Sequence, residues 1–212
     1  MIVSPLWFVG SVWFLEGSPT LDSRRAPCNH LMVTLSMPLG VTTLVSPRDG
    51  ALFARLIVSH GVLRLAASYG APLDDITLAF SGRGQPELVR LDHDRAYVLE
   101  AVADSELELE YHGNSAGASE LITTWLLSFN LIRHHLSAEQ RISKLLYLLA
   151  NQFGSRSERG ISIPFTLPHT RLAELIGCTR PTVTRQLISL RERGELHISE
   201  TYNSMLLIPR DD

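Results

Sequence analysis

The stretch GCTRPTVTRQLISL, residues 177–190, has the pattern of a glycine turn followed by a short amphipathic helix. Val183, Leu187 and Leu190 recur at helical spacing and form one apolar stripe. The other positions lower the helix propensity, because they include three threonines and a proline. Arg180 and Arg185 lie away from the stripe. This composition predicts an open face selected for contact rather than for intrinsic helix stability.

The segment before this stretch predicts a first helix. PHTRLAELI, residues 168–176, places three apolar residues on one side and Pro168 in the first turn, where proline is tolerated. Gly177 is expected to end the helix, because the left-handed position after a helix favours glycine. Two short helices joined by a glycine turn form a helix-turn-helix.

The second helix has its own start signal, and a hairpin follows it. Thr179 is the expected N-cap, accepting a hydrogen bond from the N–H of Thr182, with Pro181 at a position where a missing N–H is no loss. LHISETYNSMLLI, residues 196–208, predicts two strands around a polar turn. The hairpin would form a wing beside a helix that spans about residues 180–193.

Charge is distributed unevenly along the chain. The formal net charge is only −3, which gives no global sign of a polyanionic partner. Residues 1–136 hold nine arginines against fourteen acidic residues, whereas residues 137–212 hold ten basic against eight acidic ones. Between Arg156 and Arg193, seven arginines face three glutamates, a net charge of +4. The C-terminal segment is therefore where an anionic partner is expected to bind.

These features together predict binding to double-stranded DNA. The second helix of a helix-turn-helix enters the major groove with its N-terminal residues at the base edges. Arginine offers a bidentate fork to guanine, and threonine hydroxyls and N-terminal amides hold phosphates. The alternative is a solvated helix end on a purely structural subdomain.

The first half of the chain has the pattern of an all-β domain. Short apolar runs alternate with Gly, Pro, Asp and Asn, which favours a β-sandwich or jelly roll. The opening apolar segment, residues 1–15, is ended by Glu16 short of a membrane span, so we expect one or two buried strands there and no membrane partner. The other runs are LMVTLSM (31–37), ALFARLIV (51–58), GVLRLAA (61–67), DDITLAF (74–80), ELVRL (87–91), RAYVLEAV (95–102) and SELELEY (105–111).

A long helix is expected after the GNSAGAS break at residues 113–119, with Ser119 as its N-cap. An apolar series at spacings of 3, 4, 3 and 4 predicts a coiled-coil seam and a homodimer. The alternative is a helix packed on its own β-domain through Leu121, Leu126 and Leu131. A helix buried on both faces, one against the β-domain and one against a partner helix, is a third possibility. The predicted dimer interface consists of Ile122, Trp125, Phe129, Ile132 and Leu136.

SAEQ, residues 137–140, is a capping box that restarts a helix and marks a hinge. A polar loop is expected at residues 154–160 and a short strand at 161–167. The predicted fold is α+β, with an N-terminal jelly roll or β-roll, a dimerisation helix and a winged helix-turn-helix. Their predicted bounds are residues 1–113, 114–136 and 137–212. That the β-roll is a sensor domain of the cyclic-nucleotide-binding type is implied only by the family resemblance given next.

Residues 141–208 resemble the winged helix-turn-helix of the cyclic-AMP receptor/fumarate–nitrate regulator (CRP/FNR) family. LAELIGCTRPTVTRQLISLRERGELHIS, residues 172–199, is especially similar to the cyanobacterial global nitrogen regulator branch. The order of β-roll, long helix and hinge also resembles that family. The resemblance implies a dimeric transcription regulator with RNA polymerase as a further partner.

The resemblance also implies roles for particular residues. In the family, arginines at the positions of Arg180 and Arg185 read bases, and threonines at the positions of Thr179 and Thr182 touch phosphates. The base-reading position between them, often glutamate, is Pro181 here, which cannot hydrogen-bond, so specificity at that step must differ. We also expect Thr170 to contact phosphate.

The sensor half departs from the cyclic-nucleotide pattern. The nearest segments are SGRGQPELV (81–89) and HDRAYV (93–98), where Arg95 is displaced by one residue and no Ser or Thr precedes the alanine. We therefore expect no cyclic-nucleotide binding and no cofactor, and the sequence assigns no small-molecule effector. Arg83, Arg90 and Arg95 are expected to be surface charges.

The cysteines and histidines bear on other classes of protein. Cys28 and Cys178 are isolated, which predicts a reduced, cytoplasmic protein without a zinc or iron–sulfur site. A cupin-like enzyme would need clustered histidines, but His60, His93 and His112 are scattered, so no catalytic or metal-binding residue is expected. An interaction or ligand-sensing module with a degenerate DNA-binding wing stays open as the alternative function.

Overall fold

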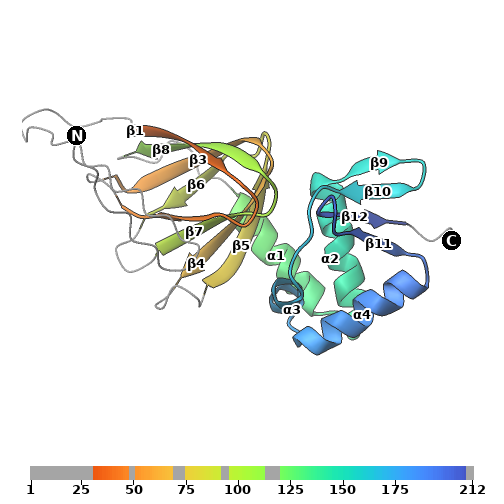
Figure 1. The fold of residues 1–212 in the computed structure, drawn as a ribbon. Helices are drawn as coiled ribbons and strands as arrows, with labels where there is room; N and C mark the ends of the chain where they lie inside the picture. Colours follow the sequence, from red (N-terminus) through yellow and green to blue (C-terminus); the bar gives the residue numbers. More distant parts are fainter. Residues whose placement is uncertain (1–30, 48–50, 69–74, 92–95, 113–119, 209–212) are drawn as a thin grey trace, which may run out of the picture. The chain divides into compact units, whose positions relative to one another are not determined.

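Two antiparallel sheets of four strands each form the described part of the N-terminal unit. The computed structural model describes residues 31–47, 51–68, 75–91, 96–112 and 120–208, and it divides into compact units at residues 1–120 and 121–212 (Figure 1). One sheet has the order β1-β8-β3-β6, formed by Leu31–Met37, Ser105–His112, Phe53–His60 and Glu87–Arg90. The other has the order β2-β7-β4-β5, formed by Thr42–Val45, Ala96–Ala101, Val62–Ser68 and Asp75–Gly82.

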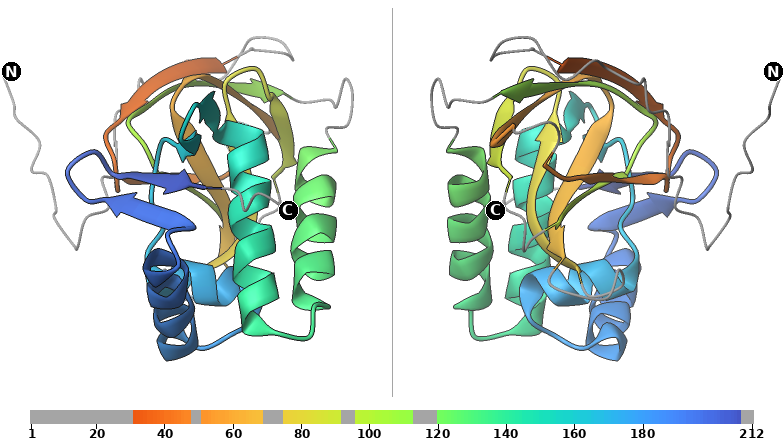
Figure 2. Two further views of the ribbon diagram at one scale, coloured as in Figure 1. Left: turned by 90° about the vertical axis from the view of Figure 1, so that its right-hand side faces the viewer. Right: turned by 90° about the vertical axis from the view of Figure 1, so that its left-hand side faces the viewer.

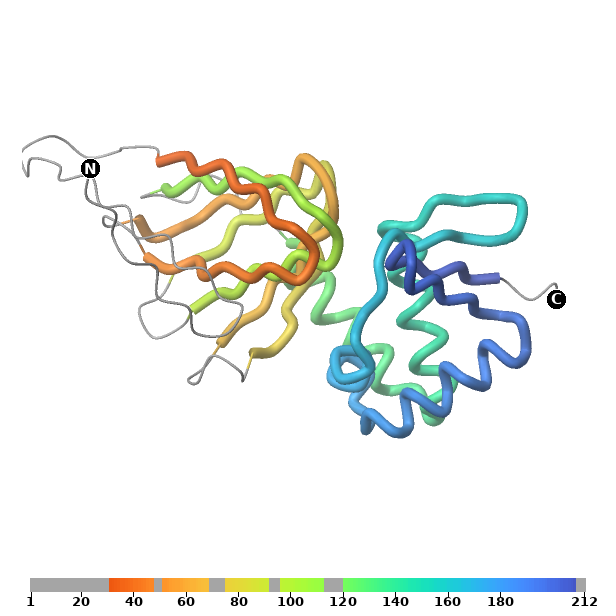
Figure 3. Tube along the Cα trace, in the orientation of Figure 1, coloured from red at the N-terminus to blue at the C-terminus, as the bar shows by residue number. Residues whose placement is uncertain are grey.

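This strand order is that of a jelly roll. Apart from the consecutive pair β4 and β5, neighbours in each sheet are distant in sequence, so the chain passes back and forth between the sheets, as its path in Figure 3 shows. The predicted α+β fold with an N-terminal β-roll is confirmed. The runs quoted above overlap seven of the eight described strands, and the sequence reasoning missed only the short β2. The opening apolar segment, Ser119 and Cys28 lie outside the described residues.

Period-two alternation sets the inner face of the sheet that contains β8 and β3. In β8, Leu107, Leu109 and Tyr111 are buried, while Glu106 and the next two glutamates point outward. β3 repeats the pattern, with Leu56 and Val58 buried. Arg83 and Arg90 are exposed, as expected of surface charges, whereas Arg95 and His93 fall outside the described residues.

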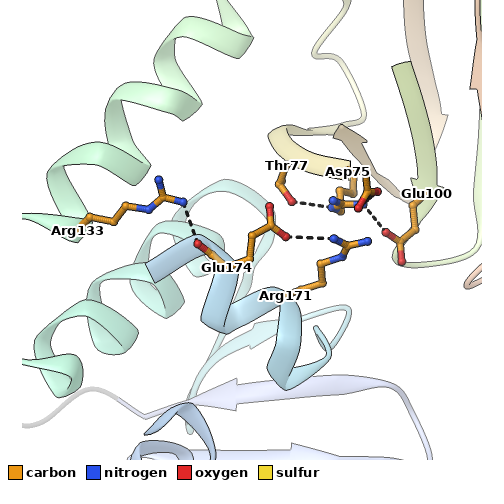
Figure 4. Close-up of polar contacts among 7 residues, drawn as sticks. Asp75, Thr77, Glu100, Arg133, Arg171 and Glu174 are labelled. Carbon is orange, nitrogen blue, oxygen red and sulfur yellow. Dashed lines mark hydrogen bonds and ion pairs between the residues drawn. The ribbon is translucent and has the colours of Figure 1, made fainter. Parts of the chain in front are cut away.

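A buried arginine joins three strands of the second sheet. The Arg64 guanidinium in β4 donates to Thr77 Oγ1 at 2.7 Å, to Asp75 Oδ2 at 2.7 Å and to Glu100 Oε2 at 2.8 Å. Figure 4 shows these three partners, which come from β5 and β7. The paired carboxylates offset the large desolvation cost of a buried cation. Sequence reasoning missed this cluster.

Four helices and four short strands form the described part of the C-terminal unit. The helices are α1 (Leu121–Arg133), α2 (Ala138–Phe153), α3 (His169–Ile176) and α4 (Arg180–Glu192). The sheet has the order β11-β12-β10-β9, formed by Leu196–Ser199, Ser204–Leu207, Gly160–Ile163 and Ser155–Ser157. Helix α1 belongs to this unit, so the division differs from the predicted one, in which residues 114–136 stood apart.

The apolar stripe of α1 packs inside its own chain. Trp125, Phe129 and Ile132 are buried, and the Trp125 ring stacks on Phe153 of α2 at a centroid distance of 5.9 Å. Phe153 in turn meets the edge of Phe165 at 5.7 Å. The prediction that these three residues form the seam of a dimer is therefore wrong for this structure. The 3,4 spacing correctly indicated the buried face of the helix, but it does not say what covers that face.

The other two residues of the predicted seam differ from these three. Ile122 is half-buried at the start of α1. Leu136 is 97% exposed, because α1 ends at Arg133 and Leu136 lies in the hinge. The described part of the chain contains no helix with the length and apolar character needed to cross a membrane.

The hinge is capped as predicted, but the segment after α2 is not a loop. Ser137 is the N-cap of α2, and its hydroxyl accepts from the N–H of Gln140 at 3.1 Å. Residues 154–160, predicted as a polar loop, instead form a hairpin of β9 and β10. The strand predicted at 161–167 ends at Ile163, because Pro164 has no N–H for a ladder bond.

Replacing Trp125 with alanine tests this packing. We expect Trp125→Ala to lower the free energy of unfolding of the C-terminal unit by about 3–5 kcal/mol, because a large side chain is removed from a closed aromatic cluster. Thr123→Ala, an exposed position on the same helix, should change it by less than about 0.5 kcal/mol. Urea unfolding followed by far-ultraviolet circular dichroism measures both. Equal, small effects would show that α1 does not pack on α2 as described.

Candidate nucleic-acid interface

Helices α3 and α4 are joined by the glycine turn that the sequence predicts. Gly177 is left-handed, with φ 64° and ψ 45°. Its N–H donates to Glu174 O at 3.3 Å, and the N–H of Cys178 donates to Ala173 O at 3.0 Å. This is the Schellman pattern, which satisfies carbonyls at the end of a helix. The predicted first helix is shorter by one residue, since Pro168 is the N-cap of α3 rather than part of its first turn.

Two arginines from either side of the hinge hold the end of α3. Arg133 donates from Nε to Leu175 O at 3.0 Å and from Nη2 to Glu174 O at 2.8 Å, a contact drawn in Figure 4. Arg141 donates from Nη1 to Ile176 O and Gly177 O, both at 3.4 Å. Cations suit this place because the last carbonyls of a helix carry partial negative charge.

Arg141 also closes the hinge itself, donating from Nε to His135 O at 2.7 Å. The end of α1, the start of α2 and the turn of the helix-turn-helix are therefore linked by side-chain to backbone bonds. The sequence showed two arginines near a capping box, but nothing in it indicated carbonyls 35 to 42 residues further along the chain.

The start of α4 matches its predicted cap. Thr179 is the N-cap, and its Oγ1 accepts from the N–H of Thr182 at 3.4 Å. The Oγ1 atoms of the two threonines also lie 2.9 Å apart, so one hydroxyl donates a hydrogen bond to the other. Since the pair has two protons and uses one, one O–H remains for an outside acceptor such as a phosphate.

The predicted contact residues lie on the open side of α4. Val183, Leu187 and Leu190 are buried, as their spacing predicts. Pro181 and Arg185 are one turn apart on the same exposed face, because four residues cover about 400° of helix. The predicted phosphate contacts Thr170 and Thr179 are exposed, and Thr182 is half-buried.

The two predicted base-reading arginines have no ion-pair partner within the described part of the chain. Arg180 and Arg185 are both exposed, and neither forms an ion pair with any residue that the structure describes. Their guanidinium groups therefore keep their donors for an outside partner.

Other arginines of the basic segment are already paired. Arg171 Nη1 lies 3.1 Å from Glu174 Oε2 within α3, a pair drawn in Figure 4. Arg193 pairs with Glu195 and with Glu139 of α2, and the hydrogen bond to Glu195 is the main cause that raises the pKa of Arg193 above its usual value. Counting charge along the sequence therefore overstates the charge available for binding.

The wing forms where the sequence predicts it. Strands β11 and β12 pair antiparallel from Leu196 with Leu207 to Ser199 with Ser204. Asn203, at φ 44°, closes the turn, and its Oδ1 accepts from Thr166 Oγ1 in the loop before α3. Both views of Figure 2 place this turn on the side of the unit where α4 lies, away from α1. The unit thus presents one face made of the second helix and the wing.

The C-terminal unit is similar to a known domain family. The family model of the Crp-like helix-turn-helix domain matches residues 140–209. The predicted resemblance to the CRP/FNR family is confirmed.

Two relatives show how far the similarity extends. The global nitrogen regulator of Synechococcus elongatus is 45% identical over 58 residues, which are 27% of this chain and 26% of that protein. Regulatory protein CysR of the same organism is 36% identical over 102 residues, 47% of this chain and 48% of that protein. The matched part thus spans about a quarter to a half of these relatives. They carry the names of regulators and not of enzymes.

Solved structures share the fold over most of the chain. TTHB099, a transcriptional regulator of the CRP family from Thermus thermophilus, has a TM-score of 0.59 at 17% identity, covering 82% of this chain and 92% of that one. A CooA mutant from Carboxydothermus hydrogenoformans has a TM-score of 0.58 at 18% identity, covering 84% and 83%. The order of jelly roll, helix and Crp-like domain is therefore an arrangement already seen in that family.

The two-arginine link can be tested by its effect on stability. Arg141→Gln leaves the carbonyls of His135, Ile176 and Gly177 without their charged donor, so we expect the Crp-like domain to lose about 1–3 kcal/mol of unfolding free energy. Arg156→Gln, at an exposed position in β9, is the matched control and should be near neutral. Chemical unfolding of both variants measures the difference. A near-neutral Arg141→Gln would mean that these bonds do not hold the turn.

Proposed function

We propose that this protein is a sequence-specific DNA-binding transcription regulator that acts in the cytoplasm as a homodimer on a near-palindromic site. The observation that carries the proposal is the pair of exposed arginines, Arg180 and Arg185, on the capped N-terminal half of α4 in a Crp-like domain. The regulator names of the relatives agree with this proposal. A module with a degenerate wing fits less well, because the arginines are free of ion pairs in the described structure and the wing is formed.

Each group on this face makes one kind of contact with DNA. α4 lies in the major groove, where Arg180 and Arg185 each present a fork of donors that matches guanine O6 and N7. The spare hydroxyl proton of the Thr179–Thr182 pair and the exposed Thr170 contact phosphates, which fix the register without reading sequence. Pro181 contributes only apolar contact at its base step.

The homodimer is proposed to form through the face of α1 opposite to Trp125. Leu127 and Leu131 are 58% and 60% exposed and lie one turn apart, with Leu126 beside them. Leu126 and Leu131 also belong to the alternative in which this helix packs on its own β-domain. Burying such leucines against a second copy removes apolar surface from water at about 25 cal/mol per Å².

Substitution of the reading arginines tests the proposed function. Arg180→Ala and Arg185→Ala should each cost about 1–3 kcal/mol of binding free energy on the preferred site and should relax selectivity at one base pair per half-site. Thr170→Ala should weaken binding to all sequences alike, because a phosphate contact carries no sequence information. Competition binding against all four base pairs at each half-site position measures both effects.

The contrast between the two kinds of variant is decisive. If Arg180→Ala and Arg185→Ala lower affinity uniformly, with no position losing selectivity, these arginines do not read bases. Pro181→Glu supplies a gain-of-contact control, since a carboxylate accepts from cytosine N4 and should move the preference at one step toward C·G.

Charge placed on the exposed face of α1 tests the proposed dimer. Leu127→Asp and Leu131→Asp should convert the dimer to a monomer and weaken binding to a two-half-site DNA, because each would bury an unpaired charge in the seam. Ile76→Asp is the matched control, since Ile76 is similarly exposed on β5 of the other unit. Analytical ultracentrifugation at micromolar concentration reports the state. Variants that stay dimeric would place the seam elsewhere.

A further inference from the structure

One side-chain contact bridges the two helices of the helix-turn-helix. His169, the first residue of α3, places Nδ1 2.9 Å from Oγ1 of Thr184, in the second turn of α4. Both side chains are half-buried at the edge of the face that carries Arg180 and Arg185. Neither residue has a role in the interface described above.

The proton positions in this bridge follow from its other hydrogen bond. The Thr184 hydroxyl donates to the backbone carbonyl of Arg180 at 3.0 Å, and a carbonyl can only accept. A hydroxyl has one proton, so Thr184 Oγ1 must accept from His169, and the hydrogen-bond pattern assigns a proton to Nδ1. One continuous chain of donors thus runs from the start of α3 to the carbonyl of Arg180.

This chain supplies a directional restraint between α3 and α4. Leu172 of α3 and Val183 and Leu187 of α4 are buried apolar residues, and apolar burial has no directional preference. A hydrogen bond prefers a donor–hydrogen–acceptor angle above about 150° and weakens steeply below about 120°, so it resists rotation of α4 about its own axis. Rotation matters here because a bidentate arginine contact needs a defined orientation at the base edge.

We propose that His169 and Thr184 are positioning residues for base recognition, holding the first turns of α4 at the rotation that brings Arg180 to its base. The inference rests on the proposed function of this helix. The bridge also links the base-reading helix to a phosphate contact, because Thr170, the expected phosphate contact, follows His169 directly in α3. Loss of the bridge should therefore disturb selectivity at the base read by Arg180 more than it disturbs phosphate contacts.

The test uses the full chain and pairs each disruptive change with a conservative one. Thr184→Val keeps the branched shape and removes the hydroxyl, whereas Thr184→Ser keeps the hydroxyl. His169→Leu removes the donor, whereas the amide Nδ2 of His169→Asn replaces Nδ1. For each variant, competition binding gives the discrimination among four base pairs at every half-site position, and the dependence of affinity on salt gives the number of phosphate contacts.

We expect Thr184→Val and His169→Leu to lose discrimination by about five-fold at the same base pair that Arg180→Ala affects. Their salt dependence should match that of the wild type, and Thr184→Ser and His169→Asn should restore the discrimination. A purely structural role would instead lower thermal stability and leave the base preferences unchanged.

Two results overturn the inference. One is wild-type selectivity in both disruptive variants. The other is a uniform loss of affinity with a shallower salt dependence, which would make Thr184 or His169 a direct phosphate contact. Failure of the proposed function looks different, since the wild type itself would then show no preference among DNA sequences.

Discussion

The burial of one apolar stripe decides which face of α4 is turned inward, and the interface depends on it. Val183, Leu187 and Leu190 are almost fully buried, and each such side chain contributes about 1.5–3 kcal/mol. The threonines on this helix cost at most about 0.7 kcal/mol each relative to alanine, and Pro181 costs little in the first turn. Burial therefore outweighs propensity, and the open face can carry residues chosen for contact.

The frame around α4 is made mostly of bonds to backbone carbonyls. The Schellman turn at Gly177, the arginines Arg133 and Arg141 and the cap at Thr179 all act within a few residues of the start of α4. Each satisfies a helix end that would otherwise be left without partners. As a result, the first turn of α4 is held from both sides while Arg180 and Arg185 stay free of ion pairs with described residues.

How much of this the sequence predicts depends on the range of the interaction. The glycine turn, the caps at Ser137 and Thr179 and the wing were predicted correctly, because each depends on residues within a few positions of one another. The apolar runs likewise gave most strands of the jelly roll. Partners that lie far along the chain were left open. The stripe of α1 shows one buried face, but only the structure shows that Phe153 and its neighbours cover Trp125. The bridge from His169 to Thr184 spans the turn itself and has no spacing signature.

The central claim is that α4 reads DNA sequence, and selection from a random pool of duplex DNA tests it most directly. The purified full-length protein is incubated with the pool at a stated salt concentration, and bound DNA is sequenced over successive rounds. We expect enrichment of one motif with two inverted half-sites whose centres lie about one helical turn, roughly 34 Å, apart. Salt-sensitive binding that enriches no sequence over the starting pool would contradict the claim, because it would leave only non-specific attraction to phosphates.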